Sequence, residues 1–153
     1  MTPADKSRLP EGTHQLSPHL ACDGAADAIA FYEKAFGAVE LMRLPGPDGR
    51  LLHACVSING SSVMLVDEYP EHGGTSPKRL KGTPVTIHLA VTDVDACIAQ
   101  AEAAGATVTM PAQDMFWGDR YGVILDPFGH QWSIATPGEP KTPEQVQEAM
   151  KAL

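Results

Sequence analysis

Apolar residues recur at helical spacing in two segments of the chain, and each segment is bounded by residues that start and stop helices. The spacing i, i+3, i+4, i+7 places these side chains on one face of a helix. Asp23 and the pair Thr92-Asp93 precede the segments as helix starts, and Gly37 and Gly105 follow as C-terminal stops. The apolar positions are Ala25, Ala28, Ile29, Tyr32 and Phe36 in the first segment, and Val94, Cys97, Ile98, Ala101 and Ala104 in the second.

Shorter segments alternate between apolar and polar residues, which is typical of half-buried β-strands. Asn59-Gly60 is a strong two-residue hairpin turn, and residues 126–129 form a turn between two further strands. Each predicted helix therefore follows one strand and precedes three, which gives the order βαβββ in both halves. The predicted strands are residues 17–22, 39–44, 51–58 and 61–66 in the first half, and residues 85–91, 107–110, 121–125 and 130–135 in the second.

An internal repeat relates the two halves. A shift of 69 positions superimposes parts of strand, helix and turn without insertion or deletion. The matches are His19-Leu20-Ala21 on His88-Leu89-Ala90, Ile29-Ala30 on Ile98-Ala99, Glu33 on Glu102, Ala35 on Ala104 and Gly60 on Gly129. We predict an α+β fold in which two βαβββ modules form curved half-sheets around a cleft. The predicted boundaries are an N-terminal tail at 1–15, module 1 at 16–68, a linker at 69–83, module 2 at 84–137 and a C-terminal tail at 138–153.

The C-terminal tail contains a further helix signal. Thr142 is an N-cap residue, Pro143 suits the first helical position, and Gln145 can close a capping box. The apolar stripe of this helix is weak, so we expect it to dock on its own body or on a partner subunit. Its members are Val146, Ala149, Met150 and Leu153.

Composition narrows the class of protein. With 43% hydrophobic and 20% charged residues the chain is expected to be globular, and it has no apolar run long enough to span a membrane. Residues 1–12 lack the apolar centre of a signal peptide, so no export is expected. Its three cysteines form no CxxC pair, which favours a reducing cytoplasm. A net charge of -8 argues against nucleic-acid binding. The basic cluster of Lys78, Arg79 and Lys81 is interpreted as a solvated loop, with an anion site as the alternative.

Three histidines are predicted to share a polar sheet face. Alternation along the first strand of each module places His19 and His88 opposite the helix side, and the Asn59-Gly60 hairpin, by pairing Cys55 with Met64, adds His53. Each histidine is alternatively a satisfied structural residue. Cys55 is read as a small buried hydrophobe rather than a reactive thiol. His14, His72 and His130 are not expected to be functional.

An aromatic loop precedes the central strand of module 2. Phe116 and Trp117 can cover a pocket and stack on a planar ligand, and Arg120 can anchor an anionic group. In the alternative, the two rings plug the sheet edge and Arg120 pairs with an acid such as Asp119. Both interpretations are open at this point. Trp132, opposite Ser133 by alternation, is predicted to be core.

Three motifs resemble the vicinal oxygen chelate superfamily, which includes the glyoxalase and bleomycin-resistance proteins. They are residues 30–37 (AFYEKAFG), His88-Leu89-Ala90-Val91 ahead of Asp93-Val94-Asp95, and Asp126-Pro127-Phe128-Gly129-His130. The stretch 17–136, including residues 117–122 (WGDRYG), looks like the PhnB-like subgroup. The resemblance implies paired βαβββ modules, a homodimer, and a cleft that holds a divalent metal in the enzymes.

The resemblance also locates the metal ligands of those enzymes, on the first and last strand of each module. The matching positions here are Ser17, Met64 (or Leu65 with a one-residue shift), Thr86 and Ser133. None is a good ligand for a divalent metal, so the usual metal site is predicted to be lost and no cofactor is identified. A displaced site made of His19, His53 and His88 is the alternative.

Two classes of function follow. In the first, the cleft binds a small molecule without chemistry, as bleomycin-binding relatives do, with a pocket of His19, His53, Cys55, His88, Phe116, Trp117 and Arg120. In the second, the chain is a lyase-type or isomerase-type enzyme of the same superfamily, with a histidine as general base and the displaced metal site. No nucleophile elbow, phosphate loop or dinucleotide fingerprint supports another class. We favour binding, and assign no catalytic residue.

Overall fold

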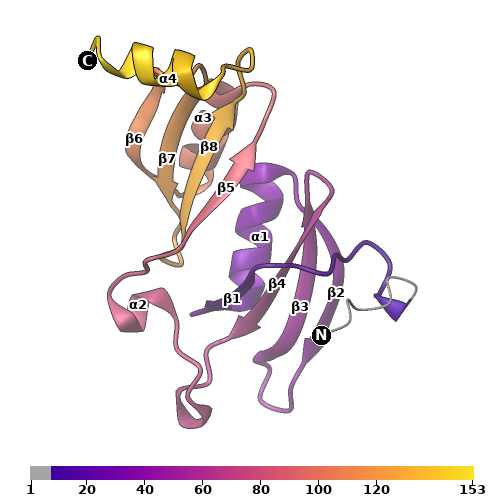
Figure 1. Cartoon of the computed structure of the whole chain (residues 1–153). Coiled ribbons are helices and arrows are strands. Elements are labelled where there is room, and N and C mark those ends of the chain that lie inside the picture. The colour runs from indigo at the N-terminus through magenta and orange to yellow at the C-terminus, as the bar shows by residue number, and fades with distance from the viewer. Residues whose placement is uncertain (1–7) are drawn as a thin grey trace. The chain divides into compact units, whose positions relative to one another are not determined.

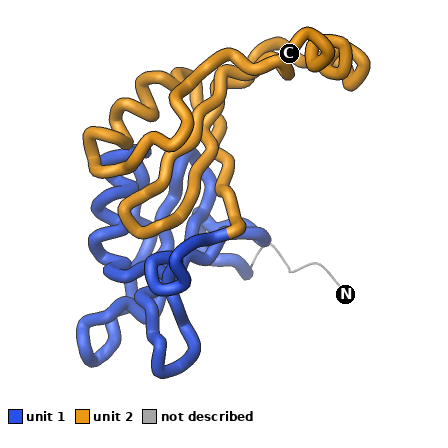
Figure 2. Tube along the Cα trace, turned by 90° about the vertical axis from the view of Figure 1, so that its left-hand side faces the viewer, with its two compact units in different colours: residues 1–83 blue, residues 84–153 orange. Residues whose placement is uncertain are grey.

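The computed structural model describes residues 8–153 and confirms the predicted fold class, α+β with two four-stranded sheets (Figure 1). The chain divides into two compact units, residues 1–83 and 84–153, shown in different colours in Figure 2. Each unit carries one sheet and is described by itself below. Within the described residues, no helix combines the length and apolar character needed to cross a membrane.

Unit 1 has the order strand, helix, three strands, followed by two short helices. In its sheet, in the order β1-β4-β3-β2, β1 runs parallel to β4 and the other neighbours are antiparallel. The elements are β1 (His19–Cys22), α1 (Ala25–Phe36), β2 (Val39–Pro45), β3 (Leu51–Ile58), β4 (Ser61–Asp67), a 3-10 helix (Pro70–His72) and α2 (Pro77–Leu80).

Unit 2 repeats this plan, with the sheet order β5-β8-β7-β6 and a C-terminal helix at one end of the sheet (Figure 1). The register of the repeat is kept: His19 pairs with Met64 across β1 and β4, and His88 pairs with Ser133 across β5 and β8. The elements are β5 (Thr86–Ala90), α3 (Val94–Ala104), β6 (Thr107–Asp114), β7 (Arg120–Leu125), β8 (Gln131–Thr136) and α4 (Pro143–Met150).

The cores form where each helix packs on one face of its sheet. All five predicted apolar positions of α1 are buried, and the α3 positions Val94, Ile98 and Ala101 are buried too. Trp132 is 1% exposed, as predicted. α3 approaches β7 so closely that a Cβ on Gly122 would lie 2.5 Å from Cδ1 of Ile98, which explains the glycine in this strand.

In each unit, the sheet strand that comes last in the sequence, β4 or β8, supplies a cap to the N-terminus of the helix. Asp67 accepts hydrogen bonds from the backbone N–H groups of Gly24 (3.2 Å) and Ala25 (2.8 Å), and Thr136 accepts one from Val94 (2.8 Å). The predicted start of α1 at Asp23 is therefore wrong, because the N-cap is Gly24 and its side-chain partner comes from 43 residues away. The N-terminus of α3 does have a local cap, since Asp93 accepts from Ala96.

Two predictions about loops need correction. The strand expected to end at Met110 continues to Asp114, because a register shift between Met110 and Gln113 lets it pass Pro111, which cannot donate a ladder hydrogen bond. The basic cluster expected in a loop lies on α2 and its C-cap, where Arg79 is 53% exposed and pairs with Glu68 at 2.6 Å.

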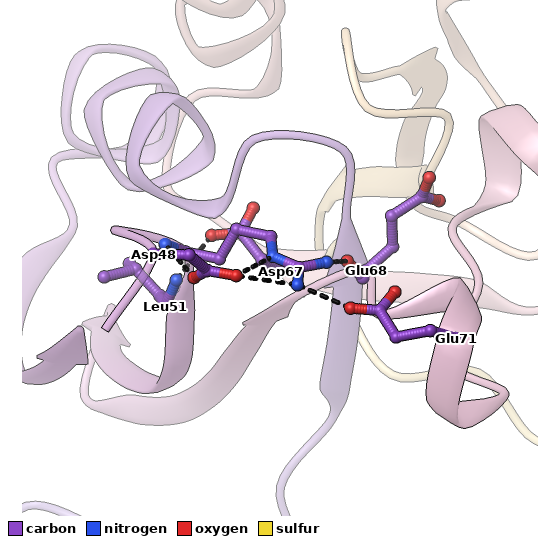
Figure 3. Close-up of polar contacts among 6 residues, drawn as sticks. Asp48, Leu51, Asp67, Glu68 and Glu71 are labelled. Atoms are coloured by element: carbon purple, nitrogen blue, oxygen red, sulfur yellow. Dashed lines mark hydrogen bonds and ion pairs between the residues drawn. The ribbon is translucent and has the colours of Figure 1, made fainter. Parts of the chain in front are cut away.

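Arg50 ties the segment after β4 to the start of β3. Its Nη2 lies 2.7 Å from Asp48 and 2.5 Å from Glu71. Figure 3 labels these two carboxylates and marks their contacts to the guanidinium with dashed lines. The guanidinium also stacks 3.9 Å from the centre of the Tyr69 ring. Arg50 therefore connects residues 48–50 to the 3-10 helix, which composition alone identified only as part of a linker.

The C-terminal helix forms as predicted, with Thr142 and Gln145 closing a capping box. Its apolar stripe is covered only in part: Val146 and Ala149 are half-buried, whereas Met150 is 49% exposed and Leu153 is 85% exposed. The expected docking of the stripe on its own body is therefore met for Val146 and Ala149 and not for Met150 and Leu153, and docking on a partner subunit stays a prediction.

Candidate ligand-binding site

Strand register in unit 2 places a set of polar and aromatic side chains on the sheet face opposite α3. Thr86 pairs with Gln131, His88 with Ser133, and Tyr121 with Ala135, so alternate residues of β5, β8 and β7 share this face. We call it the open face of unit 2. The residues between them point to the other face and form the core under α3: Leu89, Ile124, Trp132 and Ile134 are all buried.

His88 lies at the centre of the open face. Its Nδ1 is 2.7 Å from Oγ of Ser133, which is 4% exposed, and its ring is stacked against Tyr121 with 6.2 Å between centroids and 18° between planes. Nε2 has no hydrogen-bond partner among the described residues. The imidazole is therefore oriented by a buried hydroxyl and an aromatic ring, with one polar atom available.

The rings of the aromatic loop continue from Tyr121. Trp117 meets Tyr121 edge to face with centroids 5.5 Å apart, and Phe116 meets Trp117 at 5.0 Å. Phe116, Trp117, Tyr121 and His88 thus form a continuous series of ring contacts, which we call the aromatic row. All but His88 are half-buried.

The loop that carries Trp117 is held by its own hydrogen bonds and by the tail after β8. Asp119 accepts from the indole Nε1 of Trp117 (3.3 Å) and from the backbone N–H of Gly138 (3.1 Å). Lys141 Nζ donates to the carbonyl of Phe116 (3.4 Å). The position of the indole on the open face is therefore set by several contacts.

Arg120 forms ion pairs with acidic side chains, but not with Asp119. Its Nε lies 2.7 Å from Asp95 and its Nη1 lies 3.1 Å from Asp114. Hydrogen bonds to these carboxylates, Asp95 first, raise the pKa of Arg120 above its ordinary value. The guanidinium is consequently neutralised by two carboxylates, and it connects α3 to β6 in this structure.

Unit 1 presents a second group on the corresponding face of its sheet. The His19 and His53 rings lie 6.1 Å apart at 80°, and Cys55 beside them is 1% exposed. Partial burial, and then the charge of His53, lower the pKa of His19. Burial raises the pKa of the Cys55 thiol, which agrees with a small buried hydrophobe and not with a reactive thiolate. His88, the third histidine of the displaced metal site considered from the sequence, belongs to unit 2.

The four positions that resemble metal ligands hold the wrong donors. Ser17 shares a 2.5 Å hydrogen bond with Ser62, Thr86 accepts one of 2.7 Å from Gln131, and Ser133 is bonded to His88. The fourth position is the thioether of Met64. Within each unit, residues 8–153 contain no group of three or more His, Cys, Asp or Glu side chains arranged to hold a metal ion. Three neutral hydroxyls that already form hydrogen bonds, together with a thioether, do not fit a divalent metal.

Several residues of these faces escaped the sequence interpretation. Tyr121 was placed at the start of a strand without a role, although alternation from Val123, the partner of Ser133, puts it on the open face. His14 was placed in the tail without a role; its Nδ1 lies 3.2 Å from Oγ of Ser62, and the expectation that it is not functional stays a prediction. The contact of Trp117 with Tyr121 depends on how the loop folds, and no sequence periodicity reports that.

Comparisons with known proteins agree with this architecture. A family model described as "Glyoxalase/Bleomycin resistance protein/Dioxygenase superfamily" matches residues 14–134. An uncharacterized protein of Mycobacterium tuberculosis is 57% identical over 140 residues, which cover 90% of this chain and 82% of that relative.

Solved structures show the same fold. A gene product of Arabidopsis thaliana has a TM-score of 0.65 and 29% identity, and the match covers 78% of this chain and 96% of that one. TioX from Micromonospora has a TM-score of 0.64 and 27% identity, with 79% of this chain and 96% of that chain covered.

Proposed function

Since the chain belongs to the glyoxalase/bleomycin resistance protein/dioxygenase superfamily, we propose that it binds a small planar molecule on the open face of unit 2. The aromatic row would stack on the ligand, and Nε2 of His88 would form a hydrogen bond with it. A fold of this kind hosts several activities, so the proposal depends on the residues of the site.

One observation carries the proposal: rings from a loop and two strands form a continuous series on a sheet face that α3 does not cover. Trp117, Tyr121 and His88 are linked by ring contacts of 5.5 and 6.2 Å, and a buried Ser133 orients the imidazole. Aromatic surface with a few fixed polar groups is typical of small-molecule sites. Trp132 is the contrasting case, because its indole is buried and bonded to Asp126 at 2.9 Å.

Charge restricts the ligand class. Asp119 contacts Trp117 of the row, and the chain has a net charge of -8. Arg120 alternates with Tyr121 on β7 and is neutralised by Asp95 and Asp114, so it offers no free positive charge to an anionic ligand on the open face. A neutral or cationic heteroaromatic compound is therefore favoured over an anion.

A fluorescence screen tests the proposal. Planar neutral, cationic and anionic heteroaromatic compounds are titrated into the full chain, and quenching of tryptophan emission is recorded. We expect saturable quenching by neutral or cationic compounds that weakens in Tyr121→Leu and His88→Gln, while His72→Gln, in unit 1, binds as the wild type does. Binding that is unchanged in both unit 2 variants would refute the proposed site.

Catalysis is a second candidate, favoured by the 2.7 Å hydrogen bond between His88 and Ser133. An imidazole fixed through Nδ1 can exchange a proton through Nε2, as a lyase or isomerase requires. Each compound that binds is incubated with the protein and followed by proton NMR. Conversion by the wild type that His88→Gln abolishes would support an enzyme, and recovery of every compound unaltered would support binding alone.

We also propose membership of the PhnB-like subgroup and a homodimer. The segment Trp117–Gly122 supports the subgroup, and the exposed Met150 and Leu153 of the C-terminal tail support a partner subunit. Sedimentation equilibrium of the full chain should give twice the chain mass of 16.3 kDa. A monomer at micromolar concentration would contradict the dimer.

A further inference from the structure

One imidazole and three sulfur-containing side chains form a row across the sheet of unit 1. His19 on β1 pairs with Met64 on β4, Met64 pairs with Cys55 on β3, and Cys55 pairs with Met42 on β2. Paired residues point to the same face and neighbouring strands lie about 4.8 Å apart. An imidazole, a thioether, a thiol and a second thioether therefore follow one another on the face that α1 does not cover.

A second imidazole, that of His53, lies on the same face as this row. His53 is two residues from Cys55 on β3 and so shares its face, and its ring centre lies 6.1 Å from that of His19. With a metal–nitrogen distance of about 2.1 Å, a ring centre stands about 3.2 Å from the ion, so one ion can hold two ring centres up to about 6.4 Å apart. A tetrahedral angle would require about 5.2 Å. The observed separation fits one ion held at a wide angle between the two imidazoles.

We propose that unit 1 binds one cuprous ion through His19, His53 and Met64. Thioether and imidazole donors select Cu(I) over hard divalent cations, and Cu(I) accepts two or three ligands at wide angles. The site differs from the four usual metal positions of the superfamily in its ion, in both imidazoles and in lying within one unit. It is also independent of the small-molecule site proposed for unit 2.

The state of the donors suits this ion. An imidazole binds a metal in its neutral form, and a thioether carries no charge. All three donors are uncharged, so they would stabilise a monovalent ion better than a divalent one. The third donor is a methionine, which is consistent with the absence, among the described residues, of any cluster of three or more His, Cys, Asp or Glu side chains that could hold a metal ion.

The second unit provides an internal comparison. The corresponding row of its sheet contains His88, Ser133, Val123 and Met110, because the same strand pairs are formed there. A hydroxyl and an aliphatic side chain replace the two central sulfur donors. Unit 2 should therefore not bind Cu(I), although it has the same fold.

Competition with bicinchoninate, whose coloured Cu(I) complex reports the ion it retains, tests the site. The metal-free full chain is titrated with Cu(I) under nitrogen. We expect the protein to withdraw one equivalent, and His19→Ala and Met64→Leu to weaken binding by about tenfold or more. The controls are Met42→Leu and Met110→Leu, which replace a methionine by leucine outside the proposed site. Both should bind Cu(I) as the wild type does, since Met42 lies two strands, or about 10 Å, from Met64, and Met110 belongs to unit 2.

Met64→Leu nearly conserves side-chain volume, so circular dichroism should show a folded protein. Failure of the wild type to withdraw Cu(I), or equal affinity in the wild type, His19→Ala and Met64→Leu, would overturn the proposal. Stoichiometric Zn(II) binding that Met64→Leu retains would overturn the assignment to a soft ion.

Discussion

Asp67 should be among the most costly polar residues to remove from unit 1, because one carboxylate serves two backbone segments. Oδ1 accepts from Gly24 and Ala25 at the start of α1, and Oδ2 accepts from Leu51 at the start of β3 (2.6 Å). Loss of a helix cap costs roughly 1.5 kcal/mol. Loss of a charged hydrogen-bond partner costs about as much again. We therefore expect Asp67→Ala to lower the free energy of unfolding by about 3 kcal/mol.

Two further variants separate these contributions. Asp67→Asn keeps an oxygen for the helix but presents an amide to Leu51, so about half the loss is expected. Thr136→Val, at the equivalent position of unit 2, removes one neutral acceptor from Val94 and should cost about 1 kcal/mol.

The assay is urea unfolding followed by circular dichroism at 222 nm. Both tryptophans, Trp117 and Trp132, belong to unit 2, so fluorescence alone would report the wrong unit for Asp67. A change below about 0.5 kcal/mol for Asp67→Ala would refute the reasoning, because it would mean that water replaces the carboxylate at both segments.

Three other predictions can be checked separately. Gly122→Ala should destabilise the protein by about 2 kcal/mol, because its Cβ would lie 2.5 Å from an α3 side chain; urea unfolding measures this. The Arg79 guanidinium is the main cause that lowers the pKa of Glu68 to about 2, so the stabilisation is present above pH 4.5 and is lost as the pH falls toward 2. Carboxyl NMR titration of Arg79→Ala should show a pKa raised part of the way toward the ordinary value, because Ser76 still donates to this carboxylate. The pKa of His19 is lowered, so its contribution to stability is complete above pH 6.5 and declines below it; imidazole NMR should show a partial return toward 6.5 in His53→Ala, and no change would contradict the charge interaction.

Periodicity was sufficient to predict the fold because each helix and strand buries one regular face. The stripe from Ala25 to Phe36 is buried as predicted, and the strand Leu51–Ile58 has the predicted bounds. Where a distant residue determines the structure, the local pattern failed. Asp23 precedes α1 and has the right chemistry for a cap, but the backbone N–H groups at the start of α1 donate to Asp67 on β4 instead.

The site was predictable only in part, for a similar reason. Alternation placed His88 and Ser133 on one face, and the structure joins them at 2.7 Å. The partners of Arg120 come from α3 and β6, so its pairing with Asp95 and Asp114 depends on packing that one strand's pattern does not report. Met64 pairs with Cys55 in the β3–β4 hairpin, and this register could be predicted from the Asn59-Gly60 turn. Its pairing with His19 depends on the parallel register of β1 and β4, which no turn determines.

Mapping a bound compound by NMR tests the proposed site most directly. The full chain labelled with ¹⁵N has two indole N–H signals, one from Trp117 in the aromatic row and one from Trp132 in the core. Titration with a compound from the fluorescence screen should shift the Trp117 signal and the amides of Tyr121, His88 and Ser133, and leave the Trp132 signal in place. Shifts confined to unit 1 or to the Trp132 side of the sheet would contradict a ligand site on the open face of unit 2.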